Sequence, residues 1–181
     1  SWPAATREGW VLPDGNVLLA LSKGPGTPHG AAIEVKPAGA DGGEVVWRYD
    51  GTQEEVNSIQ KTAEGTYVLT EAGPHPRLRE IAADGSVKVE FPLACQKQNA
   101  HMQSRMARKQ ADGSYLVPHL LDFAIIRYDA SGRERSRIDT RVPGEPEAKS
   151  WPFTAITLAD GGVVAGLTNG NRVVEYGPDG R

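Results

Sequence analysis

The sequence lacks several features that would indicate particular classes of protein. Its one cysteine, Cys95, excludes an internal disulfide and a zinc site built on cysteines. No apolar run is long enough to cross a membrane, and the start does not resemble a secretory signal. The net charge of −3 indicates no bulk affinity for nucleic acid. The aromatic residues, 7% of the chain, are too few and too irregularly placed for a base-stacking surface.

Common catalytic and nucleotide-binding motifs are absent as well. There is no Gly-x-Ser-x-Gly elbow, no P-loop and no Gly-x-Gly-x-x-Gly after a strand. The first residue is Ser1 rather than Met, which suggests a processed end. A single cysteine fits a cytosolic or an exported chain, and of the two we favour a periplasmic or secreted location.

Glycine and proline are abundant, with 21 and 13 copies, and they mark a repeated turn. A turn with an acidic residue before glycine precedes an apolar run four times. The acidic positions are separated by 50, 48 and 48 residues and are Asp14, Glu64, Asp112 and Asp160. Such regular spacing over the whole chain indicates an internal repeat of about 48 residues.

A second glycine turn alternates with the first and lies between two strand-like runs. It occurs at 40–43, 83–86, 130–133 and 178–181. Asp-Gly between such runs is a strong hairpin signal, because both residues tolerate the positive φ of tight turns. Each repeat therefore holds four short strands, and no helical period appears. We predict an all-β fold, a β-propeller of four-stranded antiparallel blades.

The blades are predicted at approximately 1–50, 51–98, 99–147 and 148–181, and the last one lacks its outer strand. This is about 3.7 blades, which we interpret as a segment of a six- to eight-bladed ring. A compact four-bladed ring missing one strand is the alternative. A β-sandwich would not require one turn at such regular spacing, and a parallel β-helix has shorter repeats.

The repeats resemble those of a known group. Asp-Gly before an apolar strand, followed by Gly-Glu-Val-Val-Trp-Arg-Tyr at 43–49, is similar to quinoprotein-type (PQQ-like) propellers and to arylsulfotransferase-like propellers. The resemblance covers all four repeats and implies the fold. The tryptophan of the fourth strand occurs only at Trp47, with Phe91 and Ile138 in comparable places, so bound PQQ is not expected and the cofactor stays unknown.

Propellers place ligands at the axis, on the face that carries the starts of the innermost strands and the loops between second and third strands. We predict that three of these loops carry His29, His75 and His119. Imidazole there can bind an anion, transfer a proton or ligate metal, or it can only cap a strand. We predict no metal site, since equivalent positions on adjacent blades are normally too far apart to share an ion.

The starts of the innermost strands supply the other candidates. A polar cluster near 99–105 contains His101, which resembles the strand-start histidines of arylsulfotransferase-like propellers and would be the catalytic acid or base of an enzyme. Arginines, with Arg77 among them, would bind a carboxylate or sulfate, and Trp151 would stack on a ligand or wedge two blades. The remaining ligand-binding candidates are Arg7, Asn57, Asn99, Gln103 and Arg105.

Two functions follow from this sequence. We favour a non-catalytic binding or scaffold propeller that recognises a small polar or anionic molecule, or a protein segment, at the axial mouth. The alternative is a propeller enzyme of transferase, lyase or hydrolase type with a His/Arg site at the same mouth. Neither nucleic acid nor a membrane span is expected, and the oligomeric state is not indicated.

Overall fold

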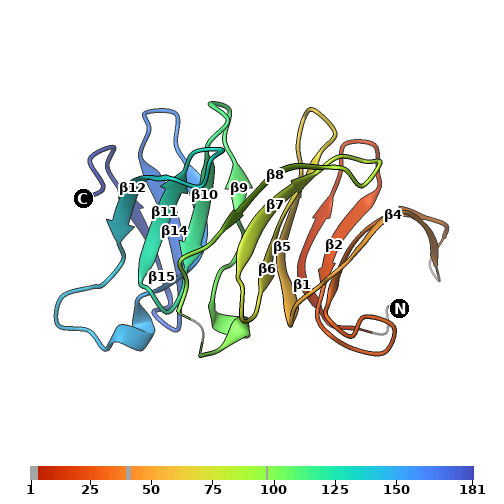
Figure 1. Ribbon diagram of the computed structural model, residues 1–181. Helices are drawn as coiled ribbons and strands as arrows, with labels where there is room; N and C mark the ends of the chain where they lie inside the picture. Colours follow the sequence, from red (N-terminus) through yellow and green to blue (C-terminus); the bar gives the residue numbers. More distant parts are fainter. Residues whose placement is uncertain (1–3, 40–41, 97) are drawn as a thin grey trace.

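The computed structural model describes residues 4–39, 42–96 and 98–181. Four antiparallel sheets follow one another along the chain in a propeller-like arrangement (Figure 1). The predicted all-β propeller of about four blades is therefore confirmed, with four strands in each of three sheets and three in the last. Within those residues, no helix has the length and apolarity needed to cross a membrane.

Each sheet forms from one repeat, and its strands pair in sequence order. The first sheet contains β1 (Thr6–Val11), β2 (Val17–Leu21), β3 (Ala31–Pro37) and β4 (Gly43–Asp50). The second contains β5 (Glu55–Lys61), β6 (Tyr67–Ala72), β7 (Arg77–Ile81) and β8 (Val87–Pro92). The third contains β9 (Arg108–Lys109), β10 (Tyr115–His119), β11 (Ala124–Tyr128) and β12 (Glu134–Asp139). The fourth contains β13 (Trp151–Thr157), β14 (Val163–Thr168) and β15 (Arg172–Tyr176). Short 3-10 helices precede β9 and β13, namely η1 (Ala100–Met102) and η2 (Glu147–Lys149).

The repeated turns form for a local reason. In the turn before β10, Asp112 Oδ1 accepts a hydrogen bond from the Ser114 backbone N–H at 3.0 Å, and Gly113 has a φ of +79°. The turns before β2 and β14 repeat both features, with acceptors Asp14 and Asp160. A short acidic side chain and a residue free to adopt positive φ are what a tight hairpin needs. The turn predicted at 40–43 begins outside the described residues.

The core consists of layers between neighbouring sheets. β6 and β10 are buried along their whole length, as expected for strands covered on both faces. Between the first and second sheets, Trp47 stacks on Tyr67 with ring centroids 3.6 Å apart. Phe91 packs against Tyr115 and Tyr128 between the second and third sheets. Each repeat therefore buries its apolar side chains against its neighbours in the sequence.

A buried glutamate links adjacent blades at two of the interfaces. Glu34 on β3 accepts hydrogen bonds from Lys61 Nζ at 2.8 Å and from Tyr67 Oη at 2.6 Å, both on the second sheet. Glu80 on β7 binds Lys109 Nζ at 2.9 Å and the hydroxyl of Tyr115 on the third sheet in the same way. We call these two clusters the glutamate tethers.

The third interface has a different polar contact. Arg127 on β11 donates to Ser114 Oγ at 3.0 Å and to Thr157 Oγ1 at 3.1 Å. Val163 occupies the place that Tyr67 and Tyr115 have in the preceding repeats, so no phenol is present to bind a carboxylate there. At the first two interfaces the charged residue on the earlier sheet is a glutamate, whereas at the third interface it is Arg127.

Candidate functional site

The axial mouth lies on the side of the molecule opposite the Asp-Gly turns, which is the lower side in Figure 1. The innermost strand of each sheet begins on this side, namely β1, β5, β9 and β13. The loops that join the second strand to the third lie on the same side. Ser1, Trp2 and Pro3, which precede β1 in the sequence, lie outside the described residues.

All four innermost strands carry an irregularity near their start. On β1, β5 and β13 the pairing shifts by one residue at Arg7, Asn57 and Phe153. On the third sheet, Ser104 faces His119 while Arg108 faces Leu116, so one extra residue lies between them, and Met106 there has a φ of +41°. A bulge of this kind redirects a side chain without ending the sheet.

The residues at these bulges occupy one repeat position. Arg7, Asn57, Arg105 and Phe153 are separated by 50, 48 and 48 residues, the same spacing as the acidic turns. We call these four side chains the bulge quartet. They lie near the start of each innermost strand, so the repeat presents one redirected side chain per blade at the mouth.

Arg105 is the most unusual member of the quartet, since only 2% of its surface is exposed. Its Nη2 donates to the His101 carbonyl oxygen, and its guanidinium lies 5.7 Å from the centroid of the Phe153 ring. Burial, reinforced by repulsion from Arg7, lowers the pKa of Arg105 to about 10. The group is still a cation at neutral pH, so the fold holds a buried positive charge.

An acidic residue and a histidine complete the cluster. Glu55, at the start of β5, binds Arg7 Nη2 at 3.0 Å and approaches His101 Nδ1 to 3.4 Å. Burial and the nearby Arg105 and Arg7 lower the pKa of His101, although Glu55 acts in the opposite direction. The His101 side chain is 46% exposed and neutral at pH 7, so it can accept a proton from a molecule at the mouth.

Several buried polar atoms of this cluster have no hydrogen-bond partner among the described residues, although Glu55 Oε2 lies 3.4 Å from His101 Nδ1. They are two donors on Arg105, one on Arg7, and one acceptor each on Glu55 and Asn57, namely Arg105 Nε and Nη1, Arg7 Nε, Glu55 Oε2 and Asn57 Oδ1. Native proteins rarely leave buried polar groups unpaired, because each costs the desolvation of that group. Five such atoms make this cluster the candidate site of the molecule.

Glu8 holds the inner strands together below this cluster. Its Oε2 accepts the Ile59 backbone N–H at 3.0 Å, and its Oε1 binds Arg108 and the Trp10 indole N–H. It therefore connects β1 to β5 and β9.

Other predicted site residues have structural roles in this structure. Gln103 uses both ends of its amide on Gly73, with Oε1 accepting from the backbone N–H at 2.8 Å and Nε2 donating to the carbonyl at 3.0 Å. Asn99 is the N-cap of η1, and its Oδ1 accepts the His101 N–H at 3.1 Å. Trp151 is half-buried, and its indole Nε1 is buried without a partner among the described residues.

The three histidines predicted in loops differ in their position and burial. His29 and His75 lie in loops between second and third strands, as expected, and both are exposed. His119 does not lie in such a loop, so that expectation is wrong: it is the last residue of β10 and is completely buried. Its ring packs beside Tyr128 and contacts Cys95, which draws it into the core and away from the mouth.

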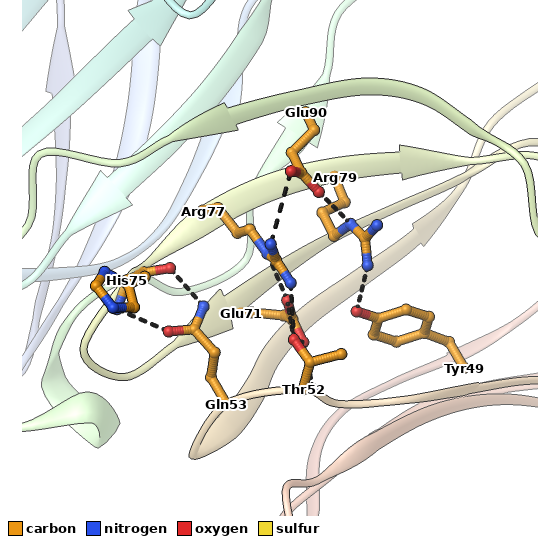
Figure 2. Close-up of polar contacts among 8 residues, drawn as sticks. All are labelled: Tyr49, Thr52, Gln53, Glu71, His75, Arg77, Arg79 and Glu90. Atoms are coloured by element: carbon orange, nitrogen blue, oxygen red, sulfur yellow. Dashed lines mark hydrogen bonds and ion pairs between the residues drawn. The ribbon is translucent and has the colours of Figure 1, made fainter.

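A second polar cluster lies around the loop that carries His75 (Figure 2). The completely buried Glu71 accepts from the Thr52 backbone N–H at 2.6 Å and from Arg77 Nε at 2.7 Å. Gln53 pairs with the backbone of His75, which leaves the imidazole free of these contacts. This cluster holds the β4–β5 connection against the second sheet, so Arg77 neutralises a buried acid and does not face the mouth unpaired.

Beside the same loop is a groove of about 320 Å³ lined by His75, Arg77, Glu90, Phe91 and Leu93, among others. Glu90 pairs there with Arg79 at 2.7 Å and with Arg77 at 3.6 Å. The charged side chains of this groove are therefore paired with one another, whereas Arg105 at the axial mouth has donors that are unpaired among the described residues.

Sequence reasoning missed Glu55 and Phe153 as members of the site. Phe153 follows the repeat spacing from Arg7, Asn57 and Arg105, so an alignment of strand starts would have found it. Glu55 has no such signal, because the corresponding position two residues before the bulge is Ala5, Gln103 or Trp151 in the other repeats.

No protein-family model and no curated protein matches the sequence. Solved structures do match it. A protein of unknown function from Bacteroides caccae is 16% identical, with a TM-score of 0.71 over 98% of this chain and 62% of that one. A streptogramin B lyase is 15% identical, with a TM-score of 0.61 over 98% and 56% of the two chains. BamB from Moraxella catarrhalis is 16% identical, with a TM-score of 0.58 over 94% and 45%.

Identities at this level show the fold alone. The lyase and BamB are β-propeller proteins, which agrees with the predicted fold class. The narrower resemblance to PQQ-like or arylsulfotransferase-like propellers stays a prediction. The chain spans 62% or less of the length of these three structures.

Proposed function

We propose that this chain is the binding part of a propeller that holds a small carboxylate at its axial mouth. The carboxylate would pair with Arg105 and Arg7, since guanidinium groups bind carboxylates through two parallel hydrogen bonds. A hydroxyl or amino group on the same ligand would donate to Glu55 and Asn57. A small hydroxycarboxylate satisfies both requirements.

The observation that carries this proposal is the unpaired buried cation. Arg105 is 2% exposed and keeps two guanidinium nitrogens, Nε and Nη1, without an acceptor among the described residues. A buried charge is normally neutralised by a partner, and breaking such a pair costs about 3–5 kcal/mol. An anion supplied by a ligand removes that cost, and Phe153 beside the guanidinium limits its approach to one side.

The comparisons are compatible with a binding role. BamB and a lyase share the fold, and neither likeness fixes an activity at 15–16% identity. The chain spans at most 62% of the length of these structures. A carboxylate ligand for the whole protein, or a protein segment that it recognises, is therefore proposed from the site and not from these comparisons.

Isothermal titration calorimetry with three small probes tests it. Glycolate carries a carboxylate and a hydroxyl, acetate carries only the carboxylate, and ethylene glycol carries no charge. We expect glycolate to bind more tightly than acetate and ethylene glycol not to bind. Saturable binding of ethylene glycol equal to that of glycolate, or no binding of either anion, would contradict the proposal. A peptide with a free C-terminus, compared with its amide, makes the same distinction for a protein segment.

Anion affinity is also expected to rise on acidification. The pKa of His101 lies below its usual value of about 6.5, so the ring is neutral at pH 7.5 and gains a proton as the pH falls through that lowered pKa. The new charge is half exposed, so we expect roughly a five-fold gain in glycolate affinity between pH 7.5 and pH 5. Calorimetry at both values measures it, and His101→Gln is expected to abolish the gain. An affinity that decreases on acidification would refute this role for His101.

A second candidate function is catalysis by His101. The half-exposed neutral imidazole beside Glu55 is suited to remove a proton from the carbon next to a bound carboxylate. Proton NMR of glycolate in D₂O with the protein detects such a step as loss of the C2 proton signal through exchange with deuterium. Exchange that disappears in His101→Gln while binding persists would favour an enzyme, and absence of exchange in the wild type leaves the binding function alone.

A further inference from the structure

Three metal-binding side chains converge between the second and third blades. Cys95 follows β8, His119 ends β10, and Asp122 lies in the loop between β10 and β11. Cys95 Sγ is 3.2 Å from His119 Nδ1, and Nδ1 is 3.6 Å from Asp122 Oδ2. The three atoms all lie within 4.8 Å of one another.

These separations are close to those of a tetrahedral zinc site. Zinc lies about 2.3 Å from thiolate sulfur and about 2.0–2.2 Å from imidazole nitrogen and carboxylate oxygen. Two ligand atoms on such a tetrahedron are therefore roughly 3.4–3.6 Å apart. The Sγ–Nδ1 distance of 3.2 Å and the Nδ1–Oδ2 distance of 3.6 Å require shifts of only a few tenths of an ångström, while the third pair, within 4.8 Å, would have to close around the ion.

The Nδ1 atom of His119 cannot hydrogen-bond the thiol and the carboxylate at the same time. The Nδ1 atom of His119 faces both the thiol and the carboxylate, but it offers either one proton or one lone pair. If Nδ1 donates to Asp122, the thiol loses its acceptor on the ring. If Nδ1 accepts from the thiol, the carboxylate loses its donor on the ring and keeps the Gln96 backbone N–H at 3.4 Å. One divalent cation would satisfy all three groups together.

The surroundings fix the ring as a ligand requires. His119 Nε2 lies 3.0 Å from the Tyr128 hydroxyl, which directs Nδ1 toward the other two groups. Histidines that bind metal usually make such a contact through their other nitrogen. Cys95 and His119 are buried, whereas the Asp122 side chain is 18% exposed and provides a path for an ion and a water.

We propose that Cys95, His119 and Asp122 bind one zinc ion, with a water molecule as the fourth ligand on the side of Asp122. A borderline-soft cation suits this mixture of sulfur, nitrogen and oxygen. Burial raises the pKa of the Cys95 thiol, so the thiol is protonated before the ion enters. Binding breaks the S–H bond, forms the Zn–S bond and releases one proton to the buffer.

The site would fasten the segment after β8 to the third sheet. None of its ligands belongs to the bulge quartet or contacts Glu55, so this inference is independent of the proposed carboxylate site. It departs from the sequence-based prediction of no metal site. That prediction concerned equivalent loop histidines on adjacent blades, whereas Cys95, His119 and Asp122 do not occupy equivalent positions.

Titration of the chelator-treated protein with Co²⁺ and Zn²⁺ tests the proposal. Co²⁺ bound to a thiolate gives a near-ultraviolet charge-transfer absorption, which reports directly on Cys95. We expect one equivalent of Co²⁺ to produce that band, Zn²⁺ to displace it, and Zn²⁺ to raise the melting temperature. Cys95→Ser should abolish the band and weaken zinc binding by more than about 100-fold, and Tyr128→Phe should weaken it about 10- to 100-fold.

Matched variants keep the test decisive. His75→Gln removes an exposed histidine outside the cluster and should leave the band and the affinity unchanged. Asp122→Asn changes a partly exposed residue and should fold even if Cys95→Ser does not, while losing most of the zinc affinity. No charge-transfer band in the wild type, or zinc affinity unchanged in Asp122→Asn, would overturn the proposal.

Discussion

Arg105→Met should abolish carboxylate binding and make the unliganded protein more stable. Methionine fills a similar volume without a charge, so two unpaired donors and one buried cation disappear together. Each unsatisfied buried group costs about 1–3 kcal/mol, and the lost hydrogen bond to the His101 carbonyl offsets part of the gain. We expect the free energy of unfolding to rise by about 1–3 kcal/mol, measured by urea denaturation.

Arg77→Met is the control for this experiment. Arg77 neutralises the buried Glu71 carboxylate at 2.7 Å, so its removal should destabilise the protein and leave glycolate affinity unchanged. An increase in the free energy of unfolding in Arg105→Met and a decrease in Arg77→Met would show that Arg105 serves a ligand and Arg77 serves the fold. If Arg105→Met destabilises the unliganded protein as much as Arg77→Met, Arg105 is a structural residue and the carboxylate site loses its main support.

Glu34→Ala is expected to cause the largest loss of stability. It leaves Lys61 and the buried Tyr67 hydroxyl without their acceptor and removes the tether between the first two blades. Removing one partner of a buried pair costs about 3–5 kcal/mol, and we expect about 3 because Lys61 can reach water. Urea denaturation measures the change, and Glu44→Ala, at an exposed position on β4, should alter it by less than about 0.5 kcal/mol.

Two further results would test the same tether. Adding Lys61→Met to Glu34→Ala should recover part of the loss, since no unpaired charge then remains. Burial opposes ionisation of Glu34, but its hydrogen bonds to Lys61, Tyr67 and Asn16 outweigh this and lower its pKa. The tether therefore stabilises the protein fully above pH 4.5 and loses that effect as the pH falls through the lowered pKa. A Glu34→Ala penalty that persists unchanged at pH 3 would refute this account.

The parts of the fold that the sequence predicts well are those with local causes. The turns at Asp14, Asp112 and Asp160 depend on one side chain bonding a backbone amide two residues on, so their spacing reports the blades directly. The axial arginine was also predictable, because Arg105 stands at the start of an innermost strand. Its burial was not, since that depends on a bulge and on Phe153 in the next repeat.

Contacts between repeats account for what was missed. The partners Glu34 and Tyr67 are 33 residues apart, and neither has a local feature that indicates the pairing. His119 was predicted in a loop between second and third strands, but it ends β10 and its ring is buried beside Tyr128. A tyrosine and a cysteine from different segments, rather than the neighbours of His119 in the chain, fix its position.

The bulge quartet has a consequence for how such a mouth can evolve. Arg7, Asn57 and Phe153 each sit on the extra residue of a strand, so replacing one of them changes no pair of the hydrogen-bonded ladder. These three side chains can therefore be exchanged one blade at a time while the framework keeps its register. Ligand preference could then change through these positions alone, and duplication of blades would supply new combinations of side chains.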